Sequence, residues 1–176
     1  MAPTQTDLEI FRAEKDDFFK THRQSPLTPE QKKTFTGLEY FPENAALKFH
    51  IKVEPFAEQE PVEFQTSSGD IKHFTRYGKL KFIVEGQPAE LTLYASEQGF
   101  FLPFVDTLAN KETYGAGRYL DPEPSPDGRV LIDFNYAYNP NCAYNPSWSC
   151  PLTPFENRLK GPIKAGEKIF PDIIHG

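Results

Sequence analysis

The chain has 176 residues, the length of one domain, and it contains 16 Phe, 8 Tyr and one Trp. The hydrophobic share of 38% is low, but each buried Phe removes about 150–250 Å² from water, so the composition is not that of a disordered chain. The formal net charge is −6 and no run of Lys and Arg exceeds two residues, which excludes the basic surface of a nucleic-acid-binding protein.

The sequence shows no membrane-targeting signal. The N-terminal residues lack the basic stretch and apolar segment of a secretory signal. The longest mostly apolar run, residues 99–105, is much shorter than the about 20 residues that span a bilayer. We therefore expect an acidic, soluble, cytoplasmic protein with neither a membrane nor a nucleic-acid partner. The sequence defines no cofactor and no oligomeric state.

Two helices are expected before the first strand. Thr6 followed by Glu9 is a capping-box pattern, and apolar residues at helical spacing predict a helix over residues 7–21. Thr28 and Pro29 repeat the start signal and predict a short helix over residues 29–33. We expect this helical segment, residues 1–34, to pack on the β-rich remainder, residues 35–176, within a single domain.

From Leu47 onward the apolar residues alternate with polar ones, which is typical of half-buried strands. The expected strands cover residues 47–53, 62–65, 71–77, 79–85, 91–95 and 99–105, with Gly78 separating the third from the fourth. The sequence Ser-Pro-Asp-Gly at 125–128 predicts a hairpin between strands 118–120 and 130–134. The whole pattern predicts a mainly β fold, either an antiparallel barrel or a strongly bent sheet.

Residues 135–163 should form a long ordered loop. Its prolines exclude a regular strand ladder, and its aromatic residues argue against disorder. A loop of this length inside a compact domain is usually functional. We expect it to close one end of the barrel.

The candidate site lies where the last strand meets this loop. Asp133 and Asn135 share one face of the strand, because side chains alternate along a strand. Ala-Tyr-Asn-Pro occurs at 137–140 and again at 143–146, and each copy places a tyrosine hydroxyl beside an Asn-Pro turn. The repeat also fits two stacked turns that only cover the end of the barrel.

Arg118 follows two glycines in the segment 113–118. Glycines allow a close backbone approach, and the guanidinium could hold a carboxylate or phosphate in two hydrogen bonds. The segment lacks the G-x-G-x-x-G spacing of dinucleotide-binding proteins. An ordinary turn in which Arg118 pairs with Asp106 or Asp133 fits the same residues.

Cys142 and Cys150 are the only cysteines. Four states are open to them: buried thiols, a disulfide, reactive thiols or metal ligands. We predict no metal site, because zinc needs about four ligands and no histidine lies close to Cys142 on its N-terminal side. The motifs of P-loop proteins, serine hydrolases, zinc hydrolases and thioredoxin-like proteins are absent.

The segments 133–144 (DFNYAYNPNCAY) and 149–159 (SCPLTPFENRL) resemble the DUF1684 family of uncharacterised prokaryotic proteins. Residues 25–27, 35–41, 113–120 and 163–168 look like further blocks of the same family, so the resemblance covers nearly the whole chain. Both cysteines stand where the family pattern has them. The resemblance implies no particular activity, but it indicates which residues matter.

Three functional hypotheses remain. In the first, the chain binds a small molecule near the 133–144 loop and could act on it chemically: Arg118 holds an anionic group and Asp133 serves as a base or an orienting carboxylate. The expected catalytic residues are Asp133, Tyr138 and Cys142, and the expected ligand-binding residues are Tyr114, Arg118, Asn135, Asn139, Tyr144 and Asn157. In the second, the same residues form a buried hydrogen-bond network in a non-catalytic binding or scaffolding module. In the third, Cys142 and Cys150 form a redox pair.

Overall fold

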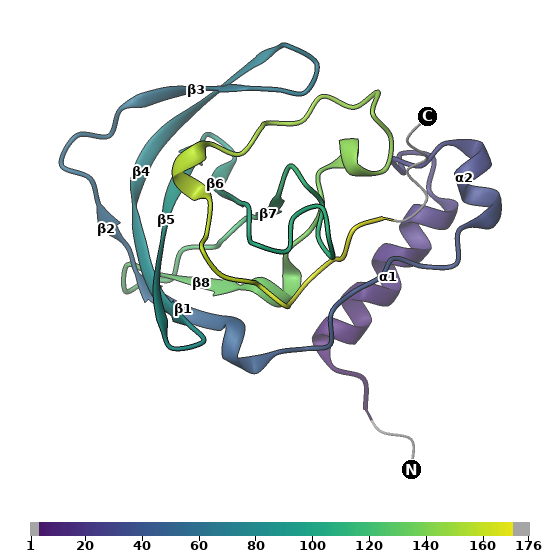
Figure 1. Cartoon of the computed structure of the whole chain (residues 1–176), viewed down its shortest axis with the longest axis horizontal. Coiled ribbons are helices and arrows are strands. Elements are labelled where there is room, and N and C mark those ends of the chain that lie inside the picture. The colour runs from purple at the N-terminus through teal and green to yellow at the C-terminus, as the bar shows by residue number, and fades with distance from the viewer. Residues whose placement is uncertain (1–3, 171–176) are drawn as a thin grey trace.

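The computed structural model describes residues 4–170 (Figure 1). Two helices precede the strands: α1 (Asp7–Thr21) and α2 (Pro29–Thr34). The strands are β1 (Lys48–Lys52), β2 (Glu54–Pro55), β3 (Pro61–Gln65), β4 (Ile71–Val84), β5 (Gln87–Ser96), β6 (Gly99–Phe104), β7 (Arg118–Leu120) and β8 (Arg129–Asp133). Four short 3₁₀ helices are η1 (Ala45–Leu47), η2 (Phe134–Tyr136), η3 (Asn141–Ala143) and η4 (Phe155–Asn157). No helix within residues 4–170 has both the length and the apolar character to cross a membrane.

Both predicted helices are confirmed. Their start signals were readable in the sequence because the capping bonds join residues only three positions apart. At the start of α1 the Thr6 hydroxyl accepts a hydrogen bond from the Glu9 amide, and the Glu9 carboxylate accepts one from the Thr6 amide, each at 3.1 Å. Thr28 and Gln31 form the same reciprocal pair at α2, which has Pro29 in its first turn. These bonds satisfy amides that have no partner inside a helix.

The strands form two antiparallel sheets. In the larger sheet the order is β2-β4-β5-β6-β7, and β3 also pairs with β4; the smaller sheet pairs β1 with β8. Figure 1 shows β4 and β5 as the long, curved strands of the molecule. The predicted mainly β, antiparallel fold is confirmed, but strand pairing among residues 4–170 does not close a barrel.

β4 is one strand where the sequence predicted two. Its pairing with β5 shifts register between Arg76 and Gly78, so the chain forms a bulge there and continues. A Cβ atom on Gly78 would lie only 2.8 Å from the Glu54 carbonyl oxygen of β2. The prediction of a break at Gly78 was therefore wrong, because this glycine marks a bulge and a close backbone approach rather than a turn.

The predicted hairpin between residues 118–120 and 130–134 is also wrong. The turn itself exists, since the Gly128 amide donates to the Ser125 carbonyl at 3.1 Å. However, β7 pairs with β6, and β8 pairs with β1. Pro122 and Pro124 lie between the two strands and offer no amide donors, which prevents a continuous ladder from leading into the turn.

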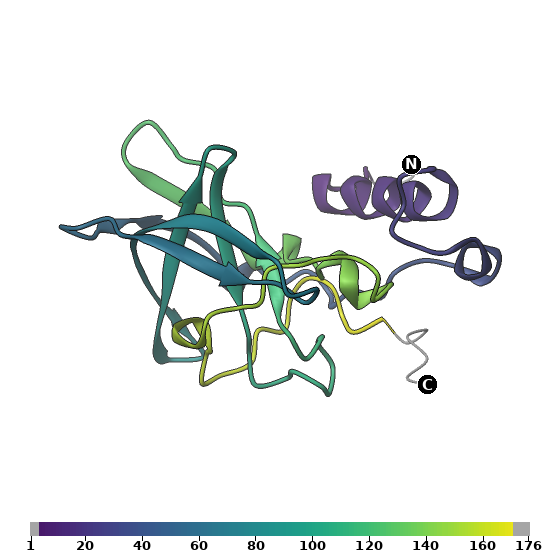
Figure 2. The same ribbon diagram turned by 90° about the horizontal axis from the view of Figure 1, so that it is seen from above.

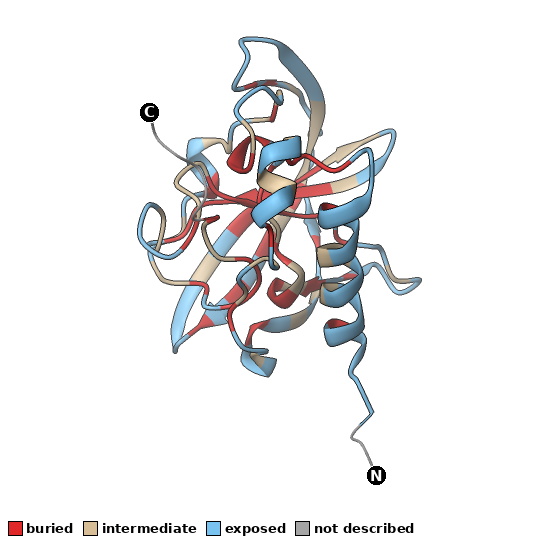
Figure 3. Ribbon diagram, turned by 90° about the vertical axis from the view of Figure 1, so that its right-hand side faces the viewer, coloured by how far each residue is buried: buried red, intermediate tan, exposed pale blue. Residues whose placement is uncertain are grey.

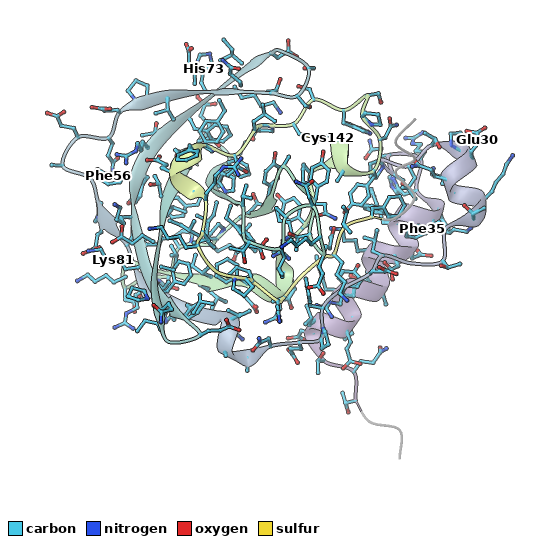
Figure 4. All side chains as sticks on the ribbon, viewed as in Figure 1. Glu30, Phe35, Phe56, His73, Lys81 and Cys142 are labelled. Atoms are coloured by element: carbon cyan, nitrogen blue, oxygen red, sulfur yellow. The ribbon has the colours of Figure 1, made fainter. Side chains whose placement is uncertain are left out.

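The helices pack on the loop that follows β8, here called the cap loop (residues 135–162). The ring of Phe19 on α1 meets Tyr144 edge to face at 4.9 Å, and Phe11 meets Tyr136 at 5.0 Å. Phe19, Tyr144 and Phe35, which is labelled in Figure 4, belong to a small second core between helices and cap loop. The main core lies among the strands. Figure 2 shows the helices set apart from the sheets, and Figure 3 shows the exposed outer face of α1.

Gly166 and Gly86 give a matched test of how tightly residues 163–168, the C-terminal segment, pack on the cap loop. Both glycines have left-handed backbones, with φ of 79° and 78°. A Cβ on Gly166 would lie 2.7 Å from the Ala137 carbonyl oxygen, whereas one on Gly86 would meet nothing within 4 Å. Gly86→Ala should lower the free energy of unfolding by about 1–2 kcal/mol, and Gly166→Ala by about 2–5 kcal/mol.

Urea unfolding of the two variants measures this difference directly. Equal losses of stability in Gly86→Ala and Gly166→Ala would contradict the close contact between the C-terminal segment and the cap loop.

Candidate functional site

Arg118 is the largest fully buried side chain of the described residues, with 1% of its surface exposed. Its guanidinium donates to three main-chain carbonyls of the C-terminal segment: those of Ile163 (2.9 Å), Ala165 and Glu167 (3.1 Å). It also lies 3.5 Å from the carboxylate of Asp106, which is equally buried. Burial lowers the pKa of Arg118 to about 10, against the opposing effect of Asp106 and Glu167, and the group stays charged near neutral pH.

Asp106 has further partners that fix its position. One carboxylate oxygen accepts a hydrogen bond from the Thr113 hydroxyl at 2.9 Å, and the other accepts one from the Ile163 amide at 2.8 Å. The ion pair therefore links the start of β7, the turn before it and the C-terminal segment. Of the two partners that the sequence left open for Arg118, the structure selects Asp106.

Glu167 is a third buried charge, with 2% of its surface exposed. Its carboxylate accepts hydrogen bonds from the Tyr144 hydroxyl and from the Asn139 amide at 3.1 Å, and it pairs with Lys15 of α1. Burial raises the pKa of Tyr144 well above its ordinary value, and the nearby Glu167 charge raises it further. The tyrosine is thus a neutral donor that holds the cap loop to the C-terminal segment.

Asn135 and Asn157 each bridge two separated segments. Asn135 exchanges hydrogen bonds with the main chain of Asn44 at 2.8 and 3.0 Å, and it donates to Asp133. Asn157 does the same with the main chain of Thr92 at 2.8 and 2.9 Å, and it also donates to the Pro103 carbonyl. Each side-chain amide thus supplies hydrogen-bond partners to backbone groups of a distant segment.

Five of the nine predicted site residues therefore make structural contacts: Arg118, Asn135, Asn139, Tyr144 and Asn157. None of these five lines either of the two cavities described next.

The first cavity, here called the acidic cavity, has a volume of about 740 Å³ and lies between α1 and strands β7 and β8. Asp133 and Tyr138 line it, together with the aromatic rings of Phe11 and Tyr136. Its charged lining residues are one lysine, Lys48, and five carboxylates: Asp7, Glu43, Asp121, Glu123 and Asp133. This balance favours a positively charged occupant.

The second cavity, here called the thiol cavity, has a volume of about 380 Å³ and includes Cys150, Tyr119 and Lys72 in its lining. Tyr138 and Asp121 line both cavities, and the Tyr138 hydroxyl donates to the Asp121 carboxylate. Burial and this hydrogen bond raise the pKa of Tyr138. The Tyr138–Asp121 pair thus stands between the acidic cavity and the thiol cavity.

Cys142 and Cys150 are both free thiols and both are buried. The Cys142 amide donates to the Cys150 sulfur at 3.2 Å, and the Tyr114 hydroxyl lies 3.8 Å from the Cys142 sulfur. The nine predicted residues thus divide into a buried network, the acidic cavity and this thiol pair. Residues 4–170 contain no group of three or more His, Cys, Asp and Glu side chains that could hold a metal ion.

Together these features define a mainly antiparallel β protein in which buried ion pairs hold a Pro- and Tyr-rich cap loop. A profile described as "Protein of unknown function (DUF1684)" matches residues 33–168, and the chain belongs to this family. An uncharacterised protein of Haloarcula marismortui, solved by solution NMR, is 36% identical with a TM-score of 0.69. The alignment covers 92% of this chain and 91% of that one. A search of curated proteins gives no match.

Sequence reasoning missed Glu167 and Asp121. Glu167 lies in the segment 163–168, one of the blocks that carry the family resemblance, so that segment held a usable signal. Asp121 directly follows the strand that contains Arg118. Neither residue forms a local motif, because their partners are distant in the sequence.

Arg118→Met should lower the free energy of unfolding by about 3–5 kcal/mol, because it leaves Asp106 charged and buried without its partner. Arg129→Met is the matched control. Its ion pair with Asp127 has the same 3.5 Å separation, but half of each side chain is exposed, so the loss should be at most about 1 kcal/mol. Urea unfolding measures both, and losses of similar size would show that Arg118 does not hold the fold together.

Proposed function

We propose that this protein binds a small organic cation in the acidic cavity. The observation that carries the proposal is the combination of five carboxylates and one lysine with aromatic rings around a cavity of about 740 Å³. A cavity of this size is in the usual range for a small-molecule site. The position agrees with the expectation of a ligand near the 133–144 loop, while the expected sign of the ligand charge is reversed.

The chemistry of the cavity favours a quaternary or substituted ammonium group. Carboxylates attract the charge over several ångströms, and aromatic faces attract the same charge through their π electrons. Phe11 and Tyr136 stand edge to face at 5.0 Å, and Tyr138 completes the aromatic lining. A cation with apolar substituents would satisfy both parts of this lining.

Arg118 has no place in this proposal. Its donors already serve the carbonyls of Ile163, Ala165 and Glu167, and its side chain is 1% exposed. An anionic ligand could reach the guanidinium only by displacing the C-terminal segment. The geometry therefore favours a ligand of the opposite charge at a neighbouring position.

Asp133 and Tyr138 have defined roles in the proposal. One oxygen of Asp133 accepts from the Asn135 amide and side chain at 3.0 and 2.9 Å, which fixes the carboxylate at the cavity wall. Tyr138 donates to Asp121 and holds that second carboxylate in place. The catalytic roles expected for Asp133 and Tyr138 stay predictions, since binding alone accounts for this arrangement.

A second candidate function is a non-catalytic scaffolding module. Five of the predicted residues make the structural contacts given above, in particular the three carbonyl bonds of Arg118, and these favour it. In this alternative the acidic cavity is an ordinary solvated groove. The two candidates differ in whether the cavity selects a cation over a neutral molecule of the same shape.

Choline and its uncharged isostere dimethylbutanol test the proposal by isothermal titration calorimetry. We expect choline to bind, dimethylbutanol to bind much more weakly, and affinity for choline to fall as salt is raised. Asp133→Asn keeps the oxygen that accepts from Asn135 but removes the charge, and it should weaken choline binding about three- to tenfold.

Asp127→Asn is the control variant, because Asp127 is exposed in the turn before β8 and is not part of the cavity lining. It should leave choline binding unchanged. If choline fails to bind, or binds no better than dimethylbutanol, the cation proposal is wrong and the scaffolding module stands.

A further inference from the structure

The two cysteines lie side by side on the cap loop, outside the acidic cavity. Cys142 belongs to η3 and Cys150 follows it at a separation of eight residues, yet the chain returns so closely that the Cys142 amide donates to the Cys150 sulfur at 3.2 Å. Figure 4 shows Cys142 in the region between sheets and helices. This contact between the Cys142 backbone and the Cys150 sulfur places the two residues next to each other, as a disulfide requires.

The backbone around Cys150 is held on the turn between β3 and β4. The Ser67 amide donates to the Cys150 carbonyl at 3.0 Å, and the Cys150 amide donates to the Ser67 hydroxyl at 3.1 Å. The neighbouring Ser149 accepts from the Ser68 hydroxyl at 2.7 Å. The sulfur of Cys150 is therefore presented to Cys142 from a fixed position.

The two thiols differ in pKa, and the pair lies at the edge of a cavity. The hydrogen bond between the two thiols and the one from Tyr114 lower the pKa of Cys142, and the same thiol–thiol hydrogen bond raises the pKa of Cys150. A thiolate is the nucleophilic form of cysteine. Cys150 and Asn141, the residue before Cys142, line the thiol cavity of about 380 Å³, so a small molecule can reach the edge of the pair.

We propose that Cys142 and Cys150 form a reversible disulfide when the protein meets hydrogen peroxide. The Cys142 thiolate attacks one peroxide oxygen, the O–O bond breaks, and the departing hydroxide takes a proton to become water. The sulfur of Cys142 is thereby oxidised to a sulfenic acid and the peroxide is reduced. The Cys150 sulfur then attacks the Cys142 sulfur, an S–S bond forms, and the hydroxyl leaves with the thiol proton as a second water.

This reaction would alter the contact between cap loop and helices. The ring closed by the disulfide contains Trp148, the only tryptophan of the chain. The Trp148 indole donates to the Pro26 carbonyl at 3.4 Å, and the Trp148 carbonyl accepts from the Ser67 hydroxyl at 3.1 Å. Closing the ring between residues 142 and 150 would move or restrain this contact, so Trp148 fluorescence reports on the state of the pair.

Hydrogen peroxide added to the purified, reduced, full-length chain tests the proposal. We expect the intact mass to fall by two hydrogens, the number of free thiols to fall from two to zero, and peptide mapping to join Cys142 to Cys150. Trp148 emission should change in parallel, and dithiothreitol should reverse all four signals.

Cys150→Ser removes the second thiol and should leave a sulfenic acid on Cys142 that dimedone traps; Cys142→Ser should give much less adduct on Cys150. Two free thiols after a peroxide exposure that oxidises free cysteine would overturn the proposal. A disulfide formed only between two chains, or dimedone labelling confined to Cys150, would overturn it as well. None of these results depends on choline binding.

Discussion

A charge buried in a protein interior is stable only when its partners are fixed around it. The buried guanidinium of Arg118 therefore constrains how distant parts of the chain pack together. It has one carboxylate partner, Asp106, and three main-chain carbonyl partners. The carbonyls belong to residues 163–167, far along the chain from β7. Correct folding of the core around β7 therefore requires the C-terminal segment to be in place.

The C-terminal segment in turn positions the cap loop. Glu167 receives hydrogen bonds from Tyr144 and Asn139, and Lys15 connects the same carboxylate to α1. Gly166 allows the two backbones to approach closely. The thiol pair lies on the cap loop, and Tyr136 and Tyr138 of the same loop line the acidic cavity. The geometry of both therefore depends in part on the buried charges of Arg118, Asp106 and Glu167.

The sequence was most informative where structure is decided locally. The capping box at Thr6 defined the start of α1, and alternation defined β1 and β3 closely. The prediction was wrong at Gly78, because a glycine is needed there for the close approach of β2 and not for a turn. It also failed for β7 and β8, because the partners of a strand are chosen by burial across the whole domain rather than by the turn between them.

The candidate site was also predictable only where local sequence patterns decide the structure. Local reasoning placed Asp133 and Tyr138 in one region, and the acidic cavity brings them together. It could not show that Arg118 is enclosed, because its carbonyl partners carry no side-chain signal in the sequence. Arg118 alone indicated an anionic ligand, whereas the acidic cavity is lined by five carboxylates from different segments and favours the opposite charge.

If the C-terminal segment is part of the cooperative core, its amides should be as well protected as those of the central strands, and native-state hydrogen exchange measures this. The informative amides are those of Ile163, Glu167 and Lys168, which donate to Asp106, Ala137 and Glu39. We expect these three amides to exchange only by global unfolding, with the same opening free energy as the most protected amides of β4 and β5. Exchange of all three by local opening, while β4 and β5 stay protected, would contradict this expectation.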